Sequence, residues 1–95
     1  MNKYELLYII ASDVAEEERN KLIEKFKAYV ESKNGTVEAL DKWGMRKFAY
    51  PINFKNEGFY VLMNFTADPL VIAEMNNLMT ITEGVVRQMF VKKDN

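Results

Sequence analysis

The cationic residues are the groups in this chain best suited to chemistry, because seven of the thirteen are gathered in two stretches without an acid. The first stretch, residues 42–55, contains Lys42, Arg46, Lys47 and Lys55, and the second, residues 87–93, contains Arg87, Lys92 and Lys93. Clustered Lys and Arg side chains bind nucleic-acid phosphates, and the guanidinium group also forks onto base edges. We predict that RNA is bound by Arg46, Lys47, Lys55, Arg87, Lys92 and Lys3.

These six residues are not equivalent. Arg46 and Lys47 are neighbours in an extended segment, so their side chains are expected on opposite faces, with one meeting RNA and the other holding a neighbouring group. Lys55, near a predicted hairpin tip, has the reach for a phosphate contact. Each residue alone is also explained by solvated surface charge, and the net charge of −1 does not indicate a nucleic-acid binder. The acid-free clustering is what favours RNA.

Several kinds of chemistry are excluded by composition. The 95 residues include no Cys and no His, which removes disulfides, thiolate nucleophiles and imidazole metal ligands. The four Gly are scattered, so no phosphate-cradling loop is indicated, and the candidate acid–base pairs reduce to acids on a solvated helix face. We predict no enzyme activity, metal, cofactor or small-molecule substrate. The charged N-terminus and the lack of a long apolar run predict a cytoplasmic protein without a membrane contact.

The elements that must position the cations follow from hydropathy patterns. Apolar and β-branched residues predict strands over 4–10, 36–52, 59–66 and 85–91, with a bulge or a bend at Gly44 and a polar loop over 53–58. Two helices are predicted, one capped near Ser12-Asp13 and ended by Asn34-Gly35, the other opened by Asp68-Pro69 and ended by Gly84. The order βαββαβ predicts a single α+β domain over residues 1–95. Its fold would be ferredoxin-like, with a four-stranded antiparallel sheet of order 4-1-3-2 and both helices on one face.

The sheet face without helices is predicted to be apolar. If alternate residues of the central strands face the helices, Leu7, Ile9, Tyr60 and Leu62 face away from them. Soluble monomers seldom leave such a patch bare, so we expect a protein contact or RNA stacking there, with cover by edge side chains as the alternative. Trp43 and Tyr50 are candidates for stacking on bases, although packing against a partner is favoured for Trp43. The predicted partner-binding residues are Leu7, Ile9, Trp43, Tyr60 and Leu62.

The most specific motif runs from Trp43 to Ile52, W-G-M-R-K-F-A-Y-P-I, and is followed by G-F-Y-V at residues 58–61. Together with Tyr4-Glu5, the Asn34-Gly35 turn and Val86-Arg87, it resembles the bacterial small-subunit ribosomal protein six family over essentially the whole chain. The resemblance implies a structural constituent of the ribosome in the cytoplasm. It also implies binding to the central domain of small-subunit rRNA as a heterodimer with small-subunit ribosomal protein eighteen.

A single-strand RNA reader of the RNA-recognition-motif type is the alternative hypothesis, because it shares this strand order. Its third-strand motif places a basic residue before Gly and a small residue between two aromatics. Here residues 57–62 read E-G-F-Y-V-L, with an acid in place of the base and a bulky Tyr in place of the small residue. Only Gly58-Phe59 matches, so this alternative is less favoured.

Overall fold

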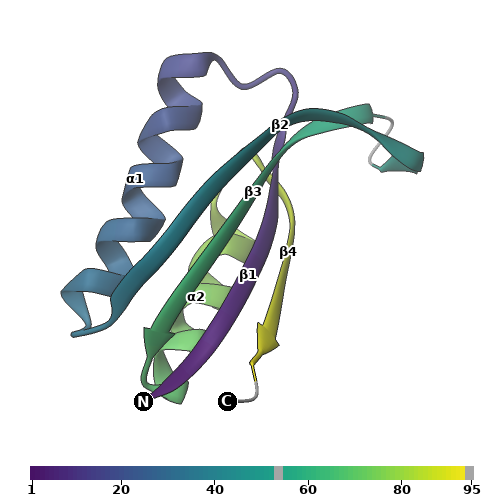
Figure 1. Ribbon diagram of the computed structural model, residues 1–95. Helices are drawn as coiled ribbons and strands as arrows, with labels where there is room; N and C mark the ends of the chain where they lie inside the picture. Colours follow the sequence, from purple (N-terminus) through teal and green to yellow (C-terminus); the bar gives the residue numbers. More distant parts are fainter. Residues whose placement is uncertain (53–54, 94–95) are drawn as a thin grey trace.

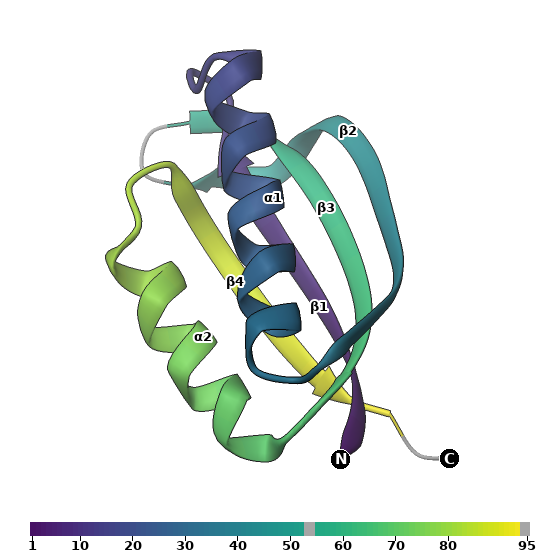
Figure 2. The same cartoon turned by 90° about the vertical axis from the view of Figure 1, so that its left-hand side faces the viewer.

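A four-stranded antiparallel sheet carries two helices on one of its faces (Figures 1 and 2). The computed structural model describes residues 1–52 and 55–93, with the side chains of all but 49–52 and 55. The elements are β1 (Asn2–Ala11), α1 (Glu16–Ser32), β2 (Thr36–Ile52), β3 (Lys55–Ala67), α2 (Pro69–Ile81) and β4 (Val85–Lys92). The strand order β2-β3-β1-β4 confirms the predicted ferredoxin-like topology, with β1 and β3 in the centre.

The two helices begin in different ways. At α2, Asp68 caps the helix by accepting a 2.9 Å hydrogen bond from the Leu70 amide, and Pro69 occupies the first helical position. The predicted cap of α1 near Ser12-Asp13 is wrong. Ala15 is the N-cap and makes no side-chain hydrogen bond, so the first turn relies on three glutamates that complement the positive helix end.

The core lies between the helices and the alternate residues of the central strands. Leu6, Tyr8 and Ile10 of β1 are fully buried, and they pack with Val61, Met63 and Phe65 of β3 under residues of both helices. The Tyr8 ring meets Phe26 edge to face at 5.4 Å. The Tyr8 hydroxyl has no hydrogen-bond partner within the described residues. Burial, aided by the charge of Glu24, raises the pKa of this hydroxyl well above its ordinary value.

The β2–β3 hairpin extends past the ends of β1 and β4 (Figure 1). Gly44 has a φ of 89° at a register shift in β2, which confirms the predicted bulge. The predicted loop over 53–58 is partly wrong, because β3 begins at Lys55 and pairs with β2 through Gly58 and Glu57. Residues 55–58 therefore extend β3. Their polar composition did not indicate a strand, because this part of the hairpin lies beyond the part of the sheet that the helices cover.

Candidate protein and nucleic-acid interface

The sheet face opposite the helices is defined by cross-strand register. Leu7 of β1 pairs with Leu62 of β3 on one side and with Met89 of β4 on the other. Directly paired residues share a face of the sheet, so these three side chains form a continuous apolar row across it. Met89 is 51% exposed, while Leu7 and Leu62 are half-buried. Met89 was missed by sequence reasoning, since only the register shows that it continues the row.

The next row contains a residue that differs from expectation. Ile9 pairs with Tyr60 and lies on the open face as predicted, yet it is only 6% exposed. Its cover is explained by Gly58 and Phe48: a Cβ added at Gly58 would lie 2.4 Å from Ile9 Cγ2 and 2.9 Å from Phe48 Cζ. The Phe48 ring and Ile9 thus occupy the space that a side chain at Gly58 would fill. Ile9 therefore offers little accessible surface to a partner.

Three aromatic side chains form a ladder at this end of the open face. The rings of Trp43 and Tyr60 are nearly parallel, 5° apart in orientation with centroids separated by 6.4 Å. Phe48 adds a tilted contact to Tyr60 at 6.2 Å. Trp43 lies at the register shift between Lys42 and Gly44 and remains 43% exposed. We call Trp43, Phe48 and Tyr60 the aromatic ladder.

Arg46 and Arg87 lie on the same open face as the aromatic ladder. Arg46 pairs with Gly58 and its guanidinium carbon lies 5.2 Å from the Trp43 ring centroid, whereas Arg87 pairs with Ile9. Three strand spacings separate the two strands, or about 14 Å. Within residues 1–52 and 55–93, neither arginine forms a salt bridge. Both are therefore available to an anionic ligand.

The other predicted RNA-binding residues are dispersed. Lys47 pairs with Glu57 and follows Arg46, so the two side chains face opposite sides as predicted. Lys92 pairs with Tyr4, a core residue, and so projects on the helix side. Lys3 is exposed at the far end of β1, beside the ion pair of Lys93 with Glu5 at 3.4 Å. The side chain of Lys55 lies outside the described residues.

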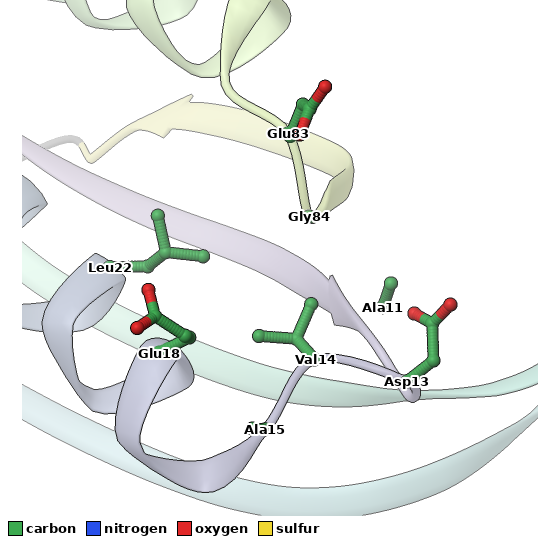
Figure 3. A pocket seen from close by; sticks show the side chains of 8 residues that line it. All are labelled: Ala11, Asp13, Val14, Ala15, Glu18, Leu22, Glu83 and Gly84. Atoms are coloured by element: carbon green, nitrogen blue, oxygen red, sulfur yellow. The ribbon is translucent and has the colours of Figure 1, made fainter.

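A pocket lies elsewhere, between the β1–α1 connection and the turn before β4 (Figure 3). Apolar side chains, including Val14 and Leu22, line it together with the acids Asp13, Glu18 and Glu83. The three carboxylates are spread apart, and in the described part of the chain no acid cluster suited to a metal ion occurs. Its charge opposes phosphate binding, so this pocket does not contribute to an RNA site.

The fold and the open face define the class of the protein: a small ferredoxin-like α+β domain that presents a mixed apolar, aromatic and cationic surface. Residues 3–92 match the family described as ribosomal protein S6. The small ribosomal subunit protein bS6 of Caldanaerobacter subterraneus subsp. tengcongensis is 44% identical over 95 residues, which is 100% of each chain. The protein of the same name from Alkaliphilus metalliredigens is 49% identical over 92 residues, 97% of each chain.

Solved structures agree with the sequence matches. The crystal structure of 30S ribosomal protein S6 from Thermotoga maritima superimposes with a TM-score of 0.92 at 35% identity, covering 97% of this chain and 87% of that one. The chain therefore belongs to the ribosomal protein S6 family, a family of structural, non-enzymatic proteins of the small ribosomal subunit. No helix in the described ranges is long and apolar enough to span a membrane.

Proposed function

We propose that this ribosomal protein binds the central domain of small-subunit rRNA as a heterodimer with small-subunit ribosomal protein eighteen. The observation that carries the proposal is the open face itself, which carries both the apolar row of Leu7, Leu62 and Met89 and the unpaired cations Arg46 and Arg87. Protein partners bury apolar surface, and RNA requires cations. One face thus supplies both requirements side by side.

The apolar row is the proposed contact for the protein partner. Contiguous apolar surface on a soluble protein marks an interaction site, and the row spans β3, β1 and β4 before it ends at Asp41 of β2, which pairs with Leu62. A charge placed within the row must be desolvated when a partner covers it. We therefore expect Leu62→Glu to weaken heterodimer formation by at least tenfold, and we expect Glu24→Gln, on the exposed side of α1, to leave it unchanged.

The rRNA contact is proposed to use Arg46 and Arg87 first, with Lys3, Lys47, Lys55 and Lys92 as peripheral contributors. Each neutralised phosphate releases counterions, so affinity should fall steeply with salt. The net charge of −1 predicts weak RNA binding by the isolated protein. A partner that extends the contact surface would raise the affinity, which accounts for a heterodimer as the binding species.

A filter-binding titration against the central-domain rRNA fragment, with and without protein eighteen, tests the proposal. We expect weak binding alone and strong binding with the partner, and a smaller salt slope for the double variant Arg46→Gln, Arg87→Gln. Identical weak binding in both arms would refute the heterodimer. Tight binding to short single-stranded RNA without the partner would instead support the RNA-recognition-motif alternative.

A further inference from the structure

We propose that Trp43, flanked by Arg46 and supported by Tyr60, is a stacking site for one unpaired nucleobase of the bound RNA. This inference deepens the proposed function and rests on its premise that the open face meets RNA. It assigns Trp43 to the RNA rather than to the protein partner, where the sequence alone had placed it. Geometry, accessibility and charge each support the assignment.

The geometry is that of a preformed platform. Tyr60 supports the indole of Trp43 in a nearly parallel arrangement at 6.4 Å, and Phe48 braces Tyr60 at 6.2 Å. The tip of the Phe48 ring in turn occupies the space that a side chain at Gly58 would fill. Because the ladder is fixed by its own contacts, little side-chain freedom remains to be lost when a base stacks on it.

Accessibility singles out Trp43 within the ladder. The indole is 43% exposed, whereas Tyr60 and Phe48 are half-buried. Trp43 lies at the bulge in β2, at the outer edge of the sheet, where β2 has no further strand beyond it. A nucleotide can therefore approach from the sheet edge without displacing any element of the fold.

Charge decides between RNA and a protein segment. The Arg46 guanidinium lies over the Trp43 ring, 5.2 Å from its centroid, and forms no salt bridge with a described residue. A nucleotide whose base takes the place of this guanidinium offers a π-face for the indole and a phosphate for the displaced cation within one unit. An apolar protein segment would cover Trp43 but leave the Arg46 charge desolvated and unpaired. The pairing of an exposed indole with a free guanidinium thus favours RNA.

The test compares four substitutions in the heterodimer with protein eighteen. Base stacking on an aromatic side chain contributes roughly 1–3 kcal/mol, and 1.4 kcal/mol corresponds to a factor of ten in affinity. We expect Trp43→Leu to weaken binding to the central-domain rRNA about tenfold and Trp43→Phe, which keeps a π-face, by less than about threefold. Arg46→Gln should weaken binding, while its matched control Lys47→Gln, on the opposite face, should have a smaller effect.

Two further measurements separate the possible failures. Trp43 is the only tryptophan of the chain, so its fluorescence should be quenched when a purine oligonucleotide such as hexaadenylate is added at low salt. Trp43→Leu should leave the affinity for protein eighteen unchanged in the absence of RNA. Wild-type rRNA affinity in Trp43→Leu, or a loss of partner affinity in that variant, overturns the stacking site alone. Failure of the wild-type heterodimer to bind rRNA overturns the proposed function, and the stacking site with it.

Discussion

Replacing Gly58 by Ala should destabilise the protein through a steric clash at the base of the aromatic ladder. The added Cβ would lie 2.4 Å from Ile9 Cγ2, 2.9 Å from Phe48 Cζ and 3.2 Å from the Ile10 carbonyl oxygen. Carbon atoms in contact are normally about 3.5–4.0 Å apart, so two side chains must move. Overpacking of this kind costs roughly 1–3 kcal/mol. With a typical urea dependence, we expect the midpoint of unfolding to fall by about 1 M.

The clash has a specific signature in a double-mutant cycle. Ile9→Ala removes the closest clashing atom, so Gly58→Ala should cost less in the Ile9→Ala background than in the wild type. Gly44→Ala is the contrasting control, because no described atom beyond its two chain neighbours lies within 4 Å of the added Cβ, while its φ of 89° opposes the substitution. Urea titrations monitored by far-ultraviolet circular dichroism measure all five proteins: the wild type, the two single variants of the cycle, their double variant and Gly44→Ala. Wild-type stability of Gly58→Ala, or equal costs in both backgrounds, would refute the packing argument.

Three further predictions concern stability. Tyr8→Phe should leave the free energy of unfolding unchanged or raise it, because the buried hydroxyl lacks a partner among the described residues. The pKa of the Tyr8 hydroxyl is raised in the folded state, so the stability that comes from keeping this hydroxyl protonated is complete below pH 10. Above pH 10 the free energy of unfolding falls by up to about 1.4 kcal/mol per pH unit. The wild type should therefore lose stability relative to Tyr8→Phe in urea titrations from pH 9 to 11. Asp68→Ala should cost about 1 kcal/mol in the same assay, through loss of the α2 cap. Glu5→Gln should cost less than about 1 kcal/mol, since its ion pair with Lys93 is exposed, and a larger loss would indicate a buried role.

The order of elements was predictable because local chemistry and burial pattern agree along most of the chain. Alternation in β1 and β3 predicted the core residues, and Asp68-Pro69 marked the start of α2 through a cap that needs no tertiary contact. The start of α1 was not predictable in this way. Two competent capping residues, Ser12 and Asp13, precede Ala15, yet the N-cap position falls on Ala15.

The site was predictable in part. The open-face assignment of Leu7, Tyr60 and Leu62 follows from parity, and the register confirms it. The contribution of Met89 and the cover over Ile9 depend on contacts between strands distant in sequence, which no local pattern encodes. The bulge at Gly44 places Trp43 beside Arg46, although two residues separate them in the sequence and alternation without a bulge would put them on opposite faces.

Competitive assembly of small subunits tests the central claim most directly. Wild-type protein and the double variant Arg46→Gln, Arg87→Gln, carrying different isotope labels, would be mixed equally with rRNA and the other subunit proteins, and their ratio in purified subunits measured by mass spectrometry. The exposed α1 pair Lys21→Gln, Lys25→Gln gives the same change in charge and serves as the control. We predict depletion of the open-face variant and equal incorporation of the α1 variant. Equal incorporation of both would contradict a cationic open face that holds the RNA.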